Sequence, residues 1–238
     1  MQKRIWELDA LRGLCILGMV VIHLVYDLVE LYGLIDWEYP LAYRLLQQWG
    51  GVLFLLISGI SVTLGQHHIR RGLMVIGGGL LCTAVTALMY FLNFADSGII
   101  IYFGVLHCLG VCMLLWHPCR KAPVWLLSVL GFVLVGLGLW LYGLSGTGTA
   151  WLIPLGLTPE GFRSSDYFPL LPHFGFFLLG AVLGKTVYRQ KKTLLPKVND
   201  QNPILRFLRW CGTQSLWIYL LHQPVLSGIC YVIFLCVE

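Results

Sequence analysis

Charged residues are scarce in this sequence. Asp, Glu, Lys and Arg together make up 11% of its 238 residues, whereas a soluble domain carries about 25%, and its mean hydropathy is +0.79. No polar stretch is long enough to form a separate soluble domain. The composition therefore predicts an integral membrane protein whose residues 1–238 form a single membrane domain.

Two other features are missing as well. The eight cysteines form no CxxC motif and no pair in an external loop, so neither a disulfide framework nor a metal site is indicated. The N-terminal stretch MQKRIWELDALRG has no small-residue cleavage site. We therefore expect no cleaved signal peptide.

Long apolar runs recur along the whole chain. A helix needs about 20 apolar residues to cross a hydrocarbon core of roughly 30 Å, and seven such spans can be drawn: 11–32, 47–65, 72–92, 99–115, 124–142, 168–187 and 212–235. The runs lack the alternating polarity of a transmembrane barrel, and backbone groups in lipid must pair within their own segment. The sequence predicts an all-α, polytopic transmembrane helix bundle of about seven spans.

Basic residues are distributed unevenly between the two ends of these spans. Of the 16 Lys and Arg residues, only Arg44 and Arg163 fall on one side of the membrane. The positive-inside rule assigns the other side to the cytoplasm, so the N-terminus is predicted to be cytoplasmic and the C-terminus external. This topology explains the net charge of +5, and no nucleic-acid partner is expected. The amphipathic stretch PILRFLRW is expected to lie on the anionic inner leaflet.

The stretch LDALRGLCILGMVVIHLVYDL places an arginine, a histidine and an aspartate in the otherwise apolar first span. Arg12 lies at its inner end, and His23 lies roughly 16 Å deeper at a rise of about 1.5 Å per residue. Asp27 follows His23 by four residues, which places both side chains on one helical face. Ionisable groups inside a span are costly and indicate a functional site; the alternative is a set of inter-helix hydrogen bonds that lock the bundle.

Histidines of other predicted spans join this layer. His107 and His222 lie near the same depth as His23, and His173 enters from the outside above them. The loop histidines are left out of the predicted site: His67, His68 and His117.

The spacing between Arg12 and His23 in LDALRGLCILGMVVIH resembles the first-helix signature of the transmembrane acyltransferase superfamily. Further stretches resemble the same group in the same order: FLLISG at 54–59, IYFGVLHCLG at 101–110, SDYFPLLPHFGFFLLGAVLG at 165–184 and GTQSLWIYLLHQPV at 212–225. Together they extend over nearly the whole chain. They most resemble bacterial proteins with a heparan-alpha-glucosaminide N-acetyltransferase catalytic domain.

This resemblance implies a multi-pass transferase of the plasma or inner cell membrane. It would move an acyl group from cytoplasmic acyl-CoA, above all acetyl-CoA, to a carbohydrate or other small acceptor, such as a sugar of an envelope glycan, at or beyond the outer face. The expected partners are the lipid bilayer, acyl-CoA and this acceptor; no metal is needed, and a homo-oligomer is left open. Lysosomal relatives carry a histidine in the external loop after the first span, whereas YGLIDWEYPLAYR has none. His23 is therefore the catalytic candidate.

The first span supplies the central roles of the expected reaction. His23 is the predicted general base or, alternatively, the transient acyl carrier, and Asp27 is predicted to orient it. Arg12 is expected to bind phosphate or pantetheine groups of acyl-CoA from the inner side, because a guanidinium makes charge-assisted contacts to such oxygens.

Residues of other spans complete the predicted site. His107 and His222 are expected to hold the thioester carbonyl or to complete the acceptor site. Asp166 and His173 are expected to contact the acceptor from outside. Two other functions remain open: a proton-coupled transporter or permease that relays protons through the His and Asp layer, and an inactive acyltransferase-like membrane protein.

Overall fold

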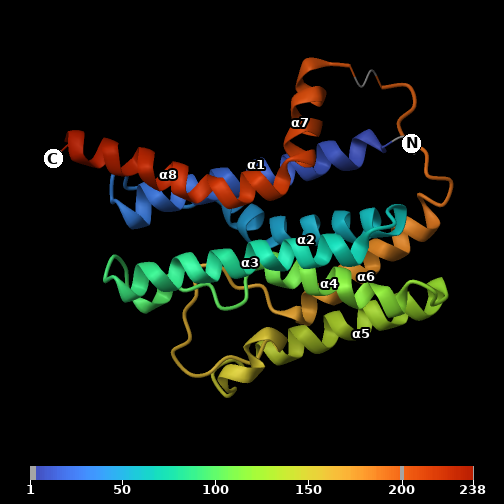
Figure 1. The fold of residues 1–238 in the computed structure, drawn as a ribbon, viewed down its shortest axis with the longest axis horizontal. Helices are drawn as coiled ribbons and strands as arrows, with labels where there is room; N and C mark the ends of the chain where they lie inside the picture. The colour runs from blue at the N-terminus through green and yellow to red at the C-terminus, as the bar shows by residue number, and fades with distance from the viewer. Residues whose placement is uncertain (1–3, 199–200, 238) are drawn as a thin grey trace. The chain divides into compact units, whose positions relative to one another are not determined.

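The protein is described by a computed structural model, in which residues 4–198 and 201–237 are placed. Regular secondary structure in this part of the chain is helical, without a strand (Figure 1). The α-helices are α1 Trp6–Tyr26, α2 Leu41–Leu64, α3 His68–Phe91, α4 Val105–Cys119, α5 Val124–Tyr142, α6 Leu170–Thr186, α7 Pro203–Thr213 and α8 Ser215–Val237. Short helices of other types are the π-helix Asp27–Leu31 and the 3-10 helices Ser97–Ile99 and Ala150–Leu155. The predicted all-α fold is confirmed.

The apolar helices correspond to the predicted spans. Those long and apolar enough to cross a membrane are Trp6–Leu31, Leu41–Leu64, His68–Phe91, Val124–Tyr142 and Ser215–Cys236. Helices α4 and α6 are apolar but shorter, with 15 and 17 residues. Helix α7 contains the amphipathic stretch PILRFLRW and ends before the candidate span Ser215–Cys236, so the last span begins later than the predicted residue 212. The number of helices that cross the bilayer stays a prediction.

The chain divides into two compact units. Unit 1 draws on Met1–Phe54 and Lys192–Glu238, and unit 2 is Leu55–Lys191. The boundary between them falls within α2, so this helix contributes residues to both. A single domain over residues 1–238 stays a prediction.

In unit 1, α1 packs against α7 and α8. Gly13 of α1 and Gly212 of α7 lie where these two helices touch, and a Cβ atom on either would collide with the backbone of the other helix. Small residues allow such direct approach between helices in membranes. Because α7 crosses α1 steeply (Figure 1), this contact brings the arginines of α7 beside the first turns of α1.

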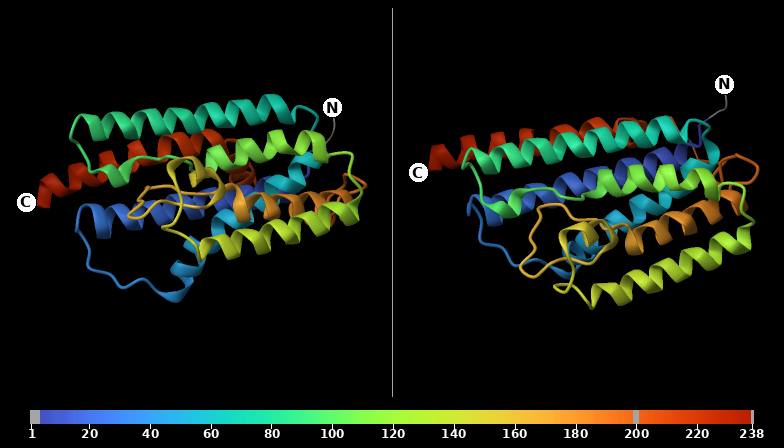
Figure 2. Two further views of the ribbon diagram at one scale, coloured as in Figure 1. Left: turned by 90° about the horizontal axis from the view of Figure 1, so that it is seen from below. Right: turned by 60° about the horizontal axis from the view of Figure 1, so that its bottom comes forward.

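In unit 2, α3 pairs with α4 and α5 pairs with α6, and both views of Figure 2 show these pairs side by side. Glycines again lie at the contacts. A Cβ atom on Gly110 would meet the backbone of α3 at Gly72, and one on Gly175 would meet the backbone of α5 at Gly131. At these glycines, the backbones of the paired helices therefore approach each other closely.

Helix α4 begins at Val105, not at the predicted residue 99. Threonines of α3 satisfy the backbone of the preceding segment: Thr83 Oγ1 donates to the Ile101 carbonyl at 2.6 Å, and the Ile101 N–H donates to Thr86 Oγ1 at 3.1 Å. Such hydrogen bonds permit a non-helical backbone at membrane depth. Helix α4 thus starts beside the middle of α3, where its first turn faces Gly79.

Candidate functional site

A buried carboxylate joins α1 to α8 in unit 1. Asp27 is 0% exposed and begins the π-helix that continues α1. Gln223 Nε2 donates to both carboxylate oxygens, at 2.8 and 3.1 Å, and Ser227 Oγ donates to Oδ2 at 3.1 Å. Gln223 and Ser227 lie one turn apart on α8. Asp27 therefore clamps the two helices together at a π-turn, a distortion that occurs often at functional sites.

Two imidazoles flank this clamp. His23 lies one turn before Asp27 on α1, and His222 directly precedes Gln223 on α8. Their ring centroids are 4.8 Å apart, with the rings at 77° to each other. His222 Nε2 and Gln223 Oε1 are buried and have no hydrogen-bond partner among the described residues. Because buried acceptors are normally paired, this region favours a ligand that donates hydrogen bonds.

The backbone determines which nitrogen of each imidazole carries the proton. His23 Nδ1 lies 2.9 Å from the Met19 carbonyl, and His222 Nδ1 lies 2.6 Å from the Tyr219 carbonyl. A carbonyl only accepts, so in the neutral imidazoles each Nδ1 donates a proton and each Nε2 carries a lone pair. Both histidines therefore have Nε2 available as a proton acceptor, which a general base requires.

The hydrogen-bond partners of Asp27 lie on α8, and its predicted orienting role toward His23 stays a prediction. The hydrogen bonds that its carboxylate accepts come from α8, and His23 Nδ1 bonds to Met19 of its own helix. Side chains in a helix lean toward its N-terminus, which takes the His23 ring toward Met19 and away from Asp27. Asp27 is therefore bonded to α8, the helix that carries His222.

Arg12 lies closer to the start of α1. Its side chain is 20% exposed, and its guanidinium is 3.6 Å from Asp9 Oδ1. Asp9 also lines a cavity of about 340 Å³ where α7 meets the start of α1. The basic and aromatic residues of this cavity are Arg4, Arg206, Arg209 and Trp210. Guanidinium groups of this kind bind phosphate oxygens, and an indole can stack on a nucleotide base.

Sequence reasoning missed this cavity. The stretch PILRFLRW indicated an amphipathic surface helix and nothing more. A usable signal was present, since Arg206 and Arg209 are three residues apart and share a face of α7. Their position beside α1 depends on the Gly13 and Gly212 contact, which no pattern within α7 reveals.

His107 lies in unit 2 and has both ring nitrogens occupied. Nδ1 accepts from the Gly104 N–H at 3.3 Å, so Nε2 carries the proton, and it lies 3.4 Å from Thr83 Oγ1. The side chain is 7% exposed. Unlike His23 and His222, this imidazole offers no free lone pair, which favours a structural role at the start of α4. Its predicted contact with acyl-CoA stays a prediction.

The predicted outer contacts also belong to unit 2. Asp166 Oδ2 accepts from the Val105 N–H at 3.0 Å, a favourable position for a carboxylate at a helix N-terminus. His173 lies in the first turn of α6, with Nδ1 2.6 Å from the Pro169 carbonyl and its ring against Phe168. The structure thus brings Asp166 to the helix start that contains His107, and it leaves Nε2 of His173 as an acceptor.

Within residues 4–198 and 201–237, no group of three or more His, Cys, Asp and Glu side chains is placed to hold a metal ion. Comparisons of the chain with curated proteins and with solved structures give no match. A family model described as heparan-alpha-glucosaminide N-acetyltransferase, catalytic, matches residues 4–224. This range contains Arg12, His23, Asp27 and His222, and it confirms the predicted family. The chain belongs to the heparan-alpha-glucosaminide N-acetyltransferase catalytic family.

Proposed function

We propose that the protein is an integral membrane acyltransferase that takes an acyl group, acetyl above all, from cytoplasmic acyl-CoA. The acceptor is a small molecule at the outer face, such as a sugar of an envelope glycan. Family membership supports a membrane transferase of the acetyltransferase type. The observation that carries the proposal is the pair of adjacent imidazoles, His23 and His222, each with Nδ1 bonded to a carbonyl and Nε2 free to accept.

His23 is the general base of the proposed reaction. Its Nε2 takes the proton from the acceptor hydroxyl or amine as that oxygen or nitrogen attacks the thioester carbonyl. The carbon–sulfur bond breaks, and the CoA thiolate takes the proton from the imidazolium. His23 is neutral again when free CoA leaves. In the alternative route, His23 Nε2 attacks the thioester carbonyl and the carbon–sulfur bond breaks, which releases the CoA thiolate. The acceptor then takes the acyl group from Nε2, and its proton goes to the thiolate.

Of the two roles predicted for His222, the proposed one is to complete the acceptor site. A neutral imidazole with its proton on Nδ1 cannot donate through Nε2 to a thioester carbonyl. It can accept a hydrogen bond from the acceptor, beside the unpartnered Oε1 of Gln223. His222 and Gln223 would therefore orient the acceptor toward His23.

The donor site follows from the basic end of unit 1. Arg12 shares α1 with His23, so a pantetheine arm lying along this helix would connect phosphates near Arg12 to a thioester near His23. The cavity lined by Arg206, Arg209 and Trp210 is suited to the nucleotide end of CoA. Asp166 and His173 remain the proposed acceptor contacts.

The test uses the purified protein in nanodiscs with acetyl-CoA and glucosamine as the acceptor probe. Released thiol and the mass of the acetylated product are measured together. His23→Gln is expected to reduce turnover by about 10² to 10⁴ while its melting temperature is retained. His107→Gln is the matched comparison, because both ring nitrogens of His107 have partners; it is expected to lower the melting temperature and to reduce turnover per folded molecule far less.

Two outcomes would contradict the proposal. Near-wild-type turnover of folded His23→Gln would remove His23 as the base. Solute or proton flux in proteoliposomes without any thiol release would instead support the transporter alternative.

A further inference from the structure

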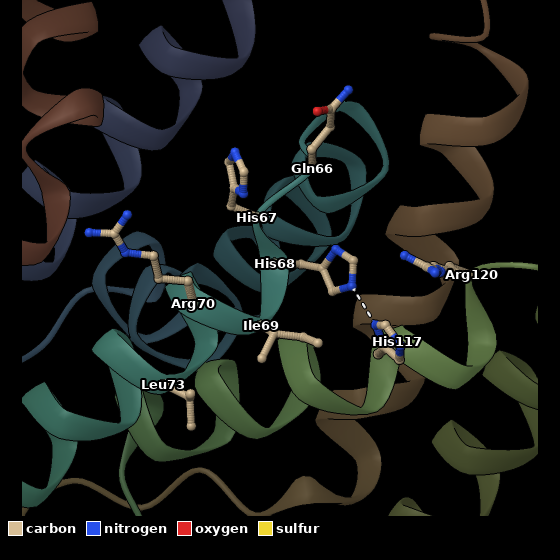
Figure 3. Close-up of a pocket in the computed structure, with 8 residues that line it drawn as sticks. All are labelled: Gln66, His67, His68, Ile69, Arg70, Leu73, His117 and Arg120. Atoms are coloured by element: carbon tan, nitrogen blue, oxygen red, sulfur yellow. Dashed lines mark hydrogen bonds between the residues drawn. The ribbon is translucent and has the colours of Figure 1, made fainter.

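A second histidine pair lies in unit 2, where α3 begins and α4 ends; we call this the basic end of the two helices. His68 Nε2 and His117 Nδ1 lie 3.0 Å apart, as the dashed line in Figure 3 marks. His68 is 7% exposed, and His117 is exposed. From the sequence, both histidines are expected in loops and outside the site. The structure places them in the first turn of α3 and the last turn of α4, where they join the two helices.

This pair lines a cavity of about 470 Å³ that also contains two arginines. Arg70 comes from α3 and Arg120 follows α4, and Figure 3 shows them on opposite sides of the histidine pair. A ligand in this cavity would therefore lie within reach of cationic groups from two helices. Guanidinium groups of this type bind phosphate oxygens with charge-assisted hydrogen bonds.

No carboxylate of unit 2 neutralises this charge. The acidic residues within 55–191 are Asp96, Glu160 and Asp166. Asp96 follows the far end of α3, and the other two lie between the far end of α5 and the start of α6. Helix α3 also begins here without a side-chain cap, so N–H groups of its first turn are not used by a capping side chain.

The histidine pair supplies a hydrogen-bond donor in either arrangement of its protons. If His68 Nε2 donates, the accepting imidazole of His117 carries its own proton on Nε2. If His117 Nδ1 donates, His68 carries its proton on Nδ1. One N–H group beyond the internal hydrogen bond is always present, so the neutral pair can bind an anion oxygen.

An apolar strip leads from the cavity along α3. Ile69 and Leu73 line the cavity, with side chains 42% and 58% exposed. Leu80, two turns further along the helix, is 58% exposed. A free phosphate would use only the cationic part of this arrangement. A phospholipid would use both parts, with its phosphate in the cavity and an acyl chain along the strip.

We propose that this cavity binds the headgroup phosphate of an anionic phospholipid. The basic end of the helices is predicted to face the cytoplasm, whose membrane leaflet carries anionic lipid, and basic pockets on that side bind such headgroups. The proposal does not depend on the acyltransferase reaction, because it concerns lipid binding by unit 2.

Native mass spectrometry of the full-length protein in detergent tests the proposal. Phosphatidylglycerol is titrated against phosphatidylcholine, which has the same chains and no net charge. Wild type is expected to retain phosphatidylglycerol preferentially, and the double variant Arg70→Gln, Arg120→Gln is expected to bind it at least tenfold more weakly. The matched control is Arg71→Gln, Lys121→Gln, which removes the same charge from adjacent exposed positions that do not line the cavity.

Three results would overturn the assignment. Equal loss of binding in both double variants would show a general electrostatic attraction and no specific cavity. Equal retention of the two lipids by wild type would exclude selection of an anionic headgroup. Displacement of phosphatidylglycerol by an equimolar concentration of inorganic phosphate would show a phosphate site in which the apolar strip has no part. Thermal unfolding of each variant confirms that the compared proteins are folded.

Discussion

Replacing Asp27 distinguishes a clamp between α1 and α8 from a charge that acts directly on His23. Asp27→Leu removes the acceptor of the Gln223 amide and of the Ser227 hydroxyl. Asp27→Asn keeps a side chain of the same shape, whose oxygen can accept from Gln223 and whose amide can donate to Ser227. The clamp therefore survives in the Asn variant and fails in the Leu variant.

The expected loss of stability follows from the groups left without a partner. Gln223 Nε2 keeps its contact with Ser227 Oγ at 3.2 Å, so Asp27→Leu leaves about one polar group unsatisfied, at a cost of about 1–3 kcal/mol. Asp27→Asn should cost less than about 1 kcal/mol, because hydrogen bonds between membrane helices average about 0.6 kcal/mol. For a chain of this length, 1 kcal/mol corresponds to about 2–4 °C. The Leu variant should therefore melt roughly 2–12 °C below wild type.

Thermal unfolding followed by tryptophan fluorescence, together with the thiol-release assay, provides the two readouts. If Asp27 is a clamp, Asp27→Asn keeps most of the turnover, and Asp27→Leu loses turnover and melting temperature together. The reasoning is refuted if Asp27→Asn lowers kcat a hundredfold at unchanged KM and melting temperature. That pattern would mean that the carboxylate charge acts directly on His23, as the sequence first indicated.

Three other changes test the donor site, the helix packing and the topology. Arg12→Ala should weaken acyl-CoA binding, measured by calorimetry, roughly tenfold to more than a hundredfold, because it removes a contact worth about 1.5–3 kcal/mol. Unchanged affinity in a folded variant would remove Arg12 from the site. Gly13→Ala should abolish folding of unit 1, because the added Cβ atom meets the α7 backbone. In Gly18→Ala the added Cβ atom meets nothing closer than 3.6 Å, so this control should melt like wild type. Equal melting temperatures of the two variants would contradict this packing. Reporter fusions at Lys192 and Asp96 should indicate cytoplasm and exterior respectively, and the same side for both would rule out the seven-span topology.

The helical fold could be predicted because backbone N–H and C=O groups in lipid must pair with each other, as they do within a helix. Where an apolar run is bounded by polar or turn residues, as at 124–142, the predicted and observed bounds agree. The start of α4 could not be predicted in this way. Residues 99–104 are as apolar as a helix, but Ile99 ends a 3-10 helix and residues 100–104 are not helical. Thr83 and Thr86 of another helix satisfy the backbone of Ile101 there.

The candidate site, too, could be predicted only in part from the sequence. Helical spacing and depth predicted a site with His23 on α1, Asp27 directly after that helix and His222 on α8. They could not show that His107, predicted at the same depth, has both nitrogens bonded. Nor could they show that the loop histidines His68 and His117 bond to each other.

By itself, the sequence determined the all-α membrane fold, the family and the ionisable residues of α1. Those properties depend on composition, on local periodicity and on motif spacing, which are all read along the chain. Only the tertiary structure decided the partners of these residues. Asp27 bonds to Gln223 and Ser227, about 200 residues away in the chain, because two helices pack where their polar groups face each other. Hydrogen bonding across helices depends on that packing, which no pattern along the chain shows.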